Sequence, residues 1–230
     1  MKAVAVSIGL AVSLATPAFG QIPSSSAEVR GIPDAKAYVQ GALELRRLAS
    51  CATEKRPNYV HTMLDSIPQS DTEVRVGQAI LKVIETCMTD FRPAMSVGFA
   101  QLRGSLAEEL YLADHKTPTN FAQLDHGSKK LPAAWISAKL TRSQASEIVA
   151  QDFAQCVVSD APELADALLR TLPRSSEEQR ALAKLAPNLG PCLASGHTFS
   201  MDAAAVRSYV AQALYRGVND WPPAAAAGGK

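Results

Sequence analysis

The four cysteines offer the clearest chemistry in the chain, and their spacing indicates which chemistry it is. They lie at positions 51, 87, 156 and 192, so each of two successive pairs is separated by 36 residues. Zinc sites are typically built from Cys-x-x-Cys pairs, which this sequence lacks. An even number of cysteines in an exported chain is typical of disulfides. Of the three possible connectivities, the equal spacing favours Cys51–Cys87 and Cys156–Cys192.

Other reactive residues form no pattern that defines an active site. The sequence lacks the nucleophile-elbow, zinc-protease, Walker and dinucleotide-binding motifs. His61 and Asp65 stand four residues apart and could together ligate a metal, but no third ligand accompanies them. The adjacent acids Glu108–Glu109 and Glu177–Glu178 diverge by about 100° on a helix, so neither pair forms a ready acid and base. We predict no catalytic residue, no metal site and no cofactor.

The N-terminus carries the features of a secretory signal peptide. Lys2 precedes an apolar stretch from Ala3 to Ala15, and Ala18-Phe19-Gly20 supplies small residues for cleavage, with Thr16-Pro17-Ala18 as an alternative site. The apolar stretch is too short to span a bilayer, and we predict no membrane span elsewhere. We expect residues 1–20 to be removed and residues 21–33 to form a flexible linker. The mature chain is then periplasmic or secreted.

The balance of charge argues against nucleic acid as a partner. The chain has 23 Lys and Arg against 22 Asp and Glu, with a formal net charge of +1. Nucleic-acid-binding proteins usually carry a basic excess or a basic stripe, and neither occurs here. The hydrophobic fraction of 47% is sufficient for a sizeable core.

The chain also repeats itself. A shift of about 105 residues superposes the two halves of the sequence, which indicates an internal duplication. The matching residues of the first half are Ala49, Cys51, Pro57, Leu64, Pro68, Ser70, Glu73, Arg75 and Cys87. Those of the second half are Ala154, Cys156, Pro162, Leu169, Pro173, Ser175, Glu178, Arg180 and Cys192. After the second cysteine the shift shortens by one residue, and Arg103 and Tyr111 match Arg207 and Tyr215.

These patterns predict an all-α protein of two tandem four-helix repeats with one disulfide each. Apolar residues recur at helical spacing, and no alternating strand pattern competes with them. The expected divisions are repeat 1 at 34–113, a connector at 114–140, repeat 2 at 141–216 and a disordered tail at 217–230. Within the connector, we expect Phe121 and Trp135 to pack on the helices.

Prolines mark helix boundaries at matching positions. Pro57 and Pro162 fit the first turn of a short second helix, where the missing amide has no partner to lose. Pro68 and Pro173 close that helix, because a proline disfavours helical geometry in the residue before it. Pro187 occurs only in the second copy, and we expect it to break or kink the third helix early.

The third helix of each copy begins with the same signal. Ser70 and Glu73 in the first copy, and Ser175 and Glu178 in the second, have the spacing of a capping box. In that motif the serine hydroxyl accepts the amide of the glutamate, and the glutamate side chain reaches back to the amide of the serine.

Two pairs of arginines match between the copies, and their role has two interpretations. Arg103 and Arg207, like Arg75 and Arg180, could clamp an acidic ligand. Alternatively, they satisfy carbonyls at helix C-termini or pair with the capping glutamates. We favour the structural interpretation, because capping and surface arginines are common.

The spacing of several motifs resembles a known group of proteins. Phe153-Ala154-Gln155-Cys156-Val157, Leu172-Pro173 with Ser175, and Cys192-Leu193 are similar to small uncharacterised exported helical proteins of alphaproteobacteria. The resemblance covers roughly residues 40–216 and includes both copies. It implies a helical repeat fold and an exported location, and it implies no activity.

Together these features favour a non-catalytic scaffold or binding protein of the cell envelope, whose partner is another protein or an apolar ligand. No set of catalytic residue types is kept in both copies. The alternative is an envelope hydrolase with one site between the copies, built from unmatched residues such as His61, Glu108 and Glu109. Such a site need not appear twice, so the duplication alone does not exclude it.

Overall fold

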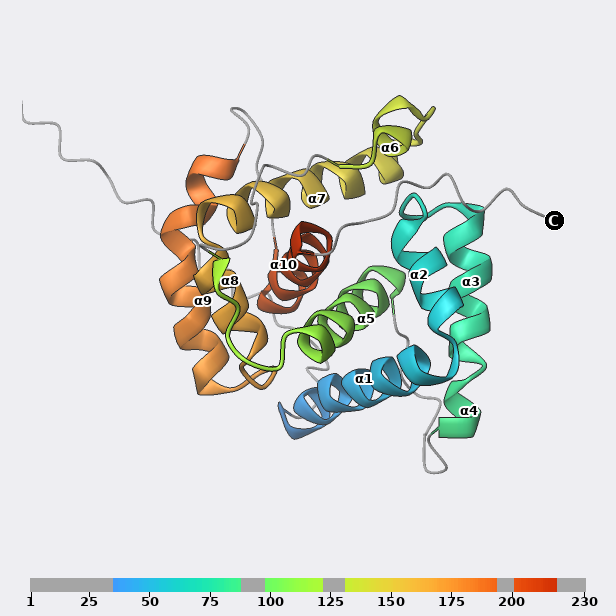
Figure 1. Ribbon diagram of the computed structural model, residues 1–230, viewed down its shortest axis with the longest axis horizontal. Helices are drawn as coiled ribbons and strands as arrows, with labels where there is room; N and C mark the ends of the chain where they lie inside the picture. The colour runs from blue at the N-terminus through green and yellow to red at the C-terminus, as the bar shows by residue number, and fades with distance from the viewer. Residues whose placement is uncertain (1–34, 88–97, 122–130, 194–200, 219–230) are drawn as a thin grey trace, which may run out of the picture. The chain divides into compact units, whose positions relative to one another are not determined.

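The chain is helical throughout the part that the computed structural model describes (Figure 1). That part comprises residues 35–87, 98–121, 131–193 and 201–218, and no strand occurs among them. The prediction of an all-α protein is confirmed for these residues, which all belong to one unit, Asp34–Lys230. The expected signal peptide and linker lie outside the described residues, as does the predicted tail from residue 219 on. The tail was predicted to begin too early, because residues 217 and 218 still belong to the last helix.

The central helices of the fold are far apart in the sequence. In chain order the helices are α1 (Ala35–Lys55), α2 (Pro57–Asp65), α3 (Asp71–Leu81), α4 (Ile84–Cys87), α5 (Phe99–Asp114), α6 (Ala133–Ser137), α7 (Arg142–Asp160), α8 (Pro162–Leu169), α9 (Ser176–Leu189), the 3₁₀ helix η2 (Gly190–Cys192) and α10 (Ala203–Val218). Helices α5 and α10 pack on each other, with α1 against α5 and α7 against α10 (Figure 1). Helix α2 packs on α3, and α8 packs on α9.

Both predicted disulfides are confirmed. Cys51–Cys87 joins α1 to the end of α4, with 6.2 Å between the Cα atoms. Cys156–Cys192 joins α7 to η2, with 5.7 Å between the Cα atoms. Each bond therefore links the first helix of its half to the segment that follows the third.

The capping serines act as predicted, but the glutamates do not. The hydroxyls of Ser70 and Ser175 accept the amides of Glu73 at 3.2 Å and Glu178 at 3.1 Å. Each glutamate side chain, however, accepts a backbone amide one residue earlier than expected. Before α3 the donor is Gln69, and before α9 it is Arg174, at 2.7 Å.

The backbone before each serine explains this difference. Gln69 and Arg174 adopt left-handed conformations, with φ of 58° and 66°, which direct their amides toward the carboxylates. The serine amides are already used, because Ser70 donates to Ile67 at 3.1 Å and Ser175 donates to Leu172 at 3.2 Å.

Other helix boundaries follow the proline pattern, with one exception. Pro57 and Pro162 lie in the first turns of α2 and α8, as predicted. Of the two effects expected of Pro187, a break or a kink, the break does not occur, because α9 continues past it to Leu189. Pro187 and Ala183 are both exposed, so water can satisfy the carbonyl that loses its helical hydrogen bond.

The buried side chains of both halves form one continuous core. Leu48, Met63 and Leu106 of the N-terminal helices belong to the same cluster as Leu168 and Leu214. Phe121 and Trp135 are buried against these helices, as expected for the connector. The indole of Trp135 donates to the carbonyl of Asp65 at 3.1 Å, which fixes α6 to the end of α2.

The closest approach of α5 and α10 requires a glycine. A Cβ atom on Gly104 would lie 2.0 Å from the hydroxyl of Ser208 and 2.6 Å from its Cα atom. The same serine hydroxyl donates to the carbonyl of Ala100 at 2.8 Å. The two helix backbones therefore pack at a distance that a larger residue at 104 does not permit.

We expect Gly104→Ala to destabilise the protein by about 1–3 kcal/mol, because the added methyl forces α5 and α10 apart. Chemical denaturation measures this loss. The second substitution Ser208→Gly should restore part of it, since it removes the hydroxyl and the Cβ atom that the methyl meets and leaves only the Cα atom. Gly190→Ala is the control, because nothing lies within 4 Å of that position. Equal stability of the Gly104→Ala and parent proteins would contradict the steric argument.

Candidate functional site

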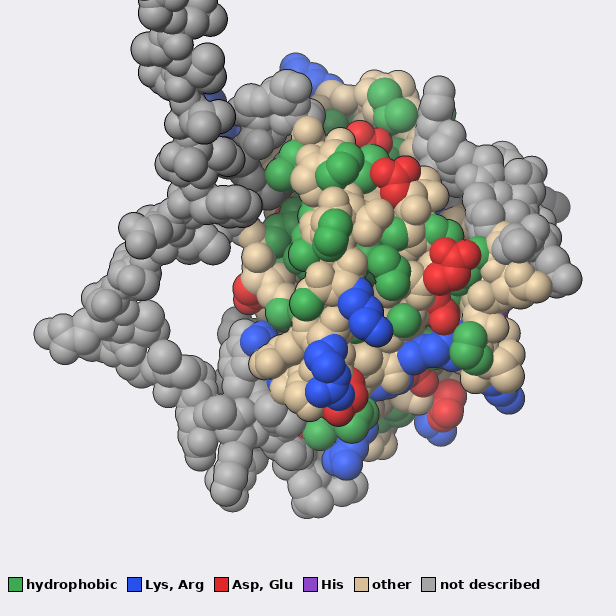
Figure 2. Space-filling model, turned by 90° about the vertical axis from the view of Figure 1, so that its left-hand side faces the viewer, with side chains coloured by type: hydrophobic (Ala, Val, Ile, Leu, Met, Phe, Trp, Pro, Cys, Tyr) green, Lys and Arg blue, Asp and Glu red, His purple; other side chains and the backbone are tan. Residues whose placement is uncertain are grey.

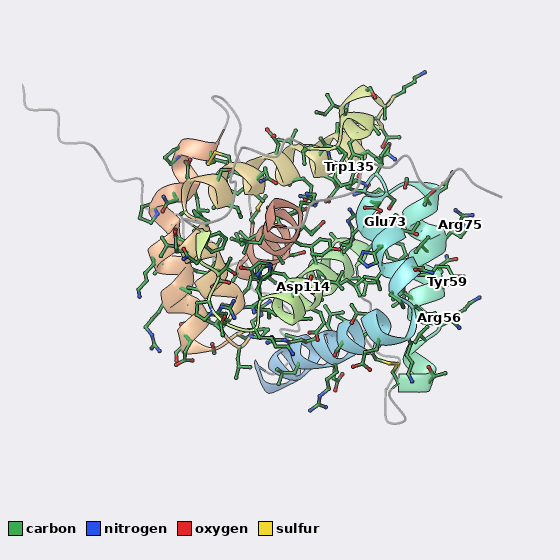
Figure 3. All side chains as sticks on the ribbon, in the orientation of Figure 1. Arg56, Tyr59, Glu73, Arg75, Asp114 and Trp135 are labelled. Carbon is green, nitrogen blue, oxygen red and sulfur yellow. A yellow bond between two sulfur atoms is a disulfide. The ribbon has the colours of Figure 1, made fainter. Side chains whose placement is uncertain are left out.

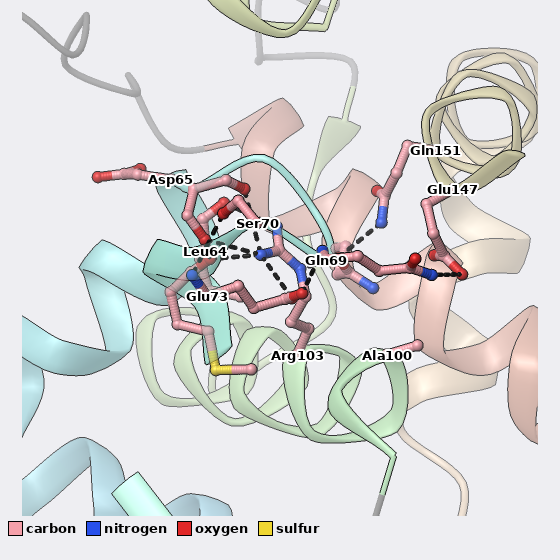
Figure 4. Close-up of polar contacts among 12 residues, drawn as sticks. Leu64, Asp65, Gln69, Ser70, Glu73, Ala100, Arg103, Glu147 and Gln151 are labelled. Atoms are coloured by element: carbon pink, nitrogen blue, oxygen red, sulfur yellow. Dashed lines mark hydrogen bonds and ion pairs between the residues drawn. The ribbon is translucent and has the colours of Figure 1, made fainter. Parts of the chain in front are cut away.

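Arg103 is bound by several groups in the interior (Figure 4). Its guanidinium donates to the carbonyl of Leu64 at 3.0 Å and to the Glu73 carboxylate at 3.1 Å, and it also contacts the carbonyl of Met63. The arginine thus joins α5 to the C-terminus of α2 and to the start of α3. The glutamate that caps α3 is also the counter-ion of this arginine.

Arg207 makes the matching contacts from α10. Its guanidinium donates to the carbonyls of Leu168 at 3.1 Å and Leu169 at 2.9 Å, and to Glu178 at 3.0 Å. All its nitrogens are engaged within the protein, since the remaining bonds go to Thr171 and Glu108. Of the other arginines considered above, Arg75 and Arg180 are exposed, and Arg180 pairs with Glu177 at 2.7 Å.

The two buried arginines differ in the third group that they meet. Glu108 accepts Arg207 through both oxygens, at 2.7 and 2.8 Å. Arg103 instead donates its Nε to the neutral Gln212 at 3.2 Å. Burial disfavours the charged form of Arg207, but bonds to Glu108 and Glu178 outweigh it and the pKa is raised. For Arg103 burial prevails over Glu73, and the pKa is lowered.

The residues suggested for a hydrolase are not brought together. His61 contacts the hydroxyl of Tyr215 through Nδ1 at 3.1 Å, and both oxygens of Glu108 bind Arg207. Glu109 is half-buried on α5, and no hydrogen bond or ion pair joins any two of the three proposed residues. Glu108 is thus an ion-pair partner rather than a base available to a substrate.

Among the described residues, only Cys156, Asp160 and Cys192 bring three metal-ligating atoms within 4.8 Å of one another. Both sulfurs belong to a disulfide, so neither is a thiolate that could bind a metal. His61 and Asp65 gain no third ligand in that part of the chain. Burial raises the pKa of Asp65, while His61 and Arg103 act in the opposite direction.

A basic pocket of about 360 Å³ lies where α1 turns into α2 beside α3 and α4. Its lining contains the cations Lys55, Arg56 and Lys82, together with Tyr59 and Thr86. Ala79 and Val83 are the other described residues of the lining, and none of the described lining residues is a carboxylate. Arg56 and Tyr59 lie together at this corner (Figure 3). We call this site the basic pocket.

Local structure explains why these side chains converge. Lys55 ends α1, and the amide of Arg56 still donates to Ala52 at 2.8 Å, which holds the corner close to α1. Lys82 caps the C-terminus of α3. Cys87 directly follows Thr86 and is bonded to Cys51, one turn before Lys55. The disulfide therefore ties the two walls of the basic pocket together.

The matching positions in the second half have a different character. The shift of about 105 residues places Asp160, Ala161 and Pro187 opposite the three cations, and Leu164 opposite Tyr59. The basic pocket thus has no charged equivalent beside the other disulfide. The basic pocket does not stand out among residues that match between the halves, because its cations occur in only one half. Comparing the halves for cations that differ would have found it.

A second pocket, of about 520 Å³, lies in the loop Ala113–Asn120 after α5. Its lining holds the oppositely charged Asp114 and Lys116 with His115. Arg170 donates to the carbonyls of His115 at 2.8 Å and Thr117 at 2.6 Å. These bonds from Arg170 hold the loop in place.

The surface on the side of α8 and α9 shows no comparable concentration of charge. Figure 2 shows basic and acidic side chains interspersed there with scattered apolar groups. None of the described helices is both long enough and apolar enough to cross a membrane.

Comparison of the chain with protein families, curated proteins and solved structures found no match. By its described residues, the chain is an all-α protein with two disulfides.

Proposed function

We propose that the protein is a non-catalytic, exported helical binding protein that holds an acidic segment of another envelope protein in the basic pocket. The observation that carries this proposal is the convergence of Lys55, Arg56 and Lys82 in one pocket, with no carboxylate among the described residues of its lining. Clustered cations attract and orient an acidic partner. The pocket is not apolar, so an acidic protein partner fits it better than an apolar ligand.

The character of the pocket also favours a protein as the partner. Tyr59 is 42% exposed, and its ring offers apolar area beside the charges. Tyrosine and arginine are enriched at the centres of protein interfaces. Thr86 adds a hydroxyl at the edge. The disulfide beside the pocket reduces the freedom lost on binding, because the walls are already linked.

The scaffold of this proposal is a pair of tandem four-helix repeats. Contacts at matching positions support it, since Arg103 and Arg207 each bind a capping glutamate and two carbonyls of the preceding short helix. Tyr111 donates to Asp166 at 2.5 Å, and the matching Tyr215 contacts His61. Each tyrosine thus crosses to the other half at an equivalent place.

The proposed location is the periplasm or the exterior of the cell. Two disulfides are compatible with an oxidising compartment. The resemblance to exported helical proteins of alphaproteobacteria, and the signal-like N-terminus, point in the same direction. The hydrolase alternative has less support, because His61, Glu108 and Glu109 are engaged elsewhere or stand apart.

The triple variant Lys55→Glu, Arg56→Glu, Lys82→Glu is expected to weaken binding of a fluorescein-labelled hexaglutamate peptide roughly tenfold or more, because three attractive charges become repulsive. Fluorescence anisotropy at low ionic strength measures the affinity. Added salt should weaken binding to the parent protein and have little effect on the variant.

The matched control is Arg75→Glu, Arg142→Glu, Lys184→Glu, which makes the same change in net charge at three exposed positions outside the pocket. This control should bind the peptide nearly as well as the parent. Equal weakening in both triple variants would mean that net charge, not the pocket, attracts the peptide.

A further inference from the structure

Arg216, in the last turn of α10, is buried, and no carboxylate among the described residues is bonded to it. Only 6% of the residue is exposed, and its Nε atom has no hydrogen-bond partner. A terminal nitrogen of Arg216 donates to the amide oxygen of Gln151. A guanidinium stays protonated under ordinary conditions, so the site holds a buried positive charge.

A second buried cation contacts the same indole ring. Arg103 and Arg216 each place their guanidinium carbon 5.6 Å from the ring centre of Trp135. Burial lowers the pKa of Arg216, and repulsion by Arg103 lowers it further. Trp135 provides favourable cation–π contact to both, but it carries no negative charge.

The hydrogen bonds around these cations end on neutral amides. Gln151 donates to Gln212 at 2.7 Å, and Gln212 also accepts from Arg103. Glu73 is the one carboxylate bonded to Arg103 in the described part of the chain. Glu147 and Asp65 also influence Arg103, but Glu147 is held by Tyr209 at 2.8 Å, and neither is bonded to Arg216.

The matching site around Arg207 shows what is missing. There Glu108 occupies the position that corresponds to Gln212, and Arg207 binds both Glu108 and Glu178. Arg46, at the position that matches Gln151, lies 3.9 Å from Glu108 with its side chain 30% exposed, and Leu112 stands at the position that matches Arg216. The Arg103 side therefore has one carboxylate fewer and a more deeply buried second arginine. Uncompensated buried charge is strongly unfavourable.

We propose that a small inorganic anion of the halide type, such as chloride, binds at the free Nε of Arg216 beside Arg103 and Trp135. The site is enclosed, because Trp135 is 2% exposed and Arg103 is 1% exposed. A monovalent ion loses less hydration on burial than sulfate or phosphate, so the enclosed site favours it. The anion neutralises the surplus charge and joins α6 to α10. This inference is independent of the basic pocket.

The test uses bromide as the probe and Trp135 as the reporter. The sequence has two tryptophans, so Trp221→Phe leaves Trp135 as the only one. Bromide titration at constant ionic strength, balanced with gluconate, is expected to quench its emission roughly twofold and saturably, because the ion lies against the ring. The thermal midpoint should rise with chloride over the same range, as expected for a ligand of the folded state.

Two variants decide the interpretation. Gln151→Glu places a carboxylate where Arg216 already donates, although it removes the amide that donates to Gln212. With folding checked by circular dichroism, it should lose both the saturable quenching and the chloride dependence. Arg216→Met, checked by circular dichroism, should lose them as well. The proposal is overturned if the parent protein responds equally to halide and gluconate, or if Gln151→Glu responds to halide as the parent does.

Discussion

Substitution of Arg207 by alanine is expected to lower the free energy of unfolding by about 3–5 kcal/mol, the range for breaking a buried ion pair from one side. The variant leaves Glu108 and Glu178 buried without their counter-ion. It also leaves the carbonyls of Leu168 and Leu169 without this donor. Denaturant unfolding followed by circular dichroism measures the loss, which is a large part of the stability of a typical domain.

Two other arginine variants serve as comparisons. Arg180→Ala removes an exposed ion pair and should change stability by less than about 0.5 kcal/mol. Arg103→Ala leaves only one buried carboxylate, Glu73, without its counter-ion, and it also relieves the repulsion on Arg216. Its loss of stability should therefore be smaller than that of Arg207→Ala. Equal losses for Arg207→Ala and Arg180→Ala would show that the buried network contributes little.

Removing the first disulfide with Cys51→Ala, Cys87→Ala is expected to cost about 3.8 kcal/mol, the chain-entropy value for a loop of about 37 residues. Binding of the hexaglutamate peptide should weaken as well, measured where the variant is still folded. The reason is that this bond ties together the two walls of the basic pocket.

The second disulfide provides a matched control. Cys156→Ala, Cys192→Ala opens a loop of the same length and should cost a similar amount of stability. It lies away from the basic pocket, so peptide affinity should remain near that of the parent. Equal affinity of both disulfide variants would mean that the Cys51–Cys87 bond stabilises the fold without shaping the pocket.

The parts of the fold that the sequence predicts correctly depend on local signals. Pro57 and Pro162 mark helix starts because their geometry suits the first turn wherever the helix packs. The hydrogen bond from the amide of Gln69 to the Glu73 carboxylate was not predictable in this way, because it depends on the left-handed conformation of Gln69. The effect of Pro187 was misjudged, because the free energy lost at a proline inside a helix depends on whether water reaches the unpaired carbonyl. The exposure of Pro187 and Ala183, which decides this, cannot be taken from the sequence.

The candidate sites depend on contacts between distant segments, and the sequence revealed less of them. Glu108 attracted attention as an acid, yet its partner Arg207 lies on another helix far along the chain. The surplus charge at Arg216 follows from burial by Trp135 and from neutral partners such as Gln151. None of these relations is marked by spacing in the sequence.

Gly104 and Ser208 match each other under the shift that relates α5 to α10, and they also touch. Equivalent residues of a symmetric pair meet only on its two-fold axis. Under the proposed duplication, the single-repeat ancestor was therefore a homodimer in which this residue faced its own copy. Serine on both sides would clash, since a Cβ atom on Gly104 lies 2.5 Å from that of Ser208. With these helix positions a symmetric pair needs glycine on both sides, and Ser208 fits here only because the residue that it faces is Gly104.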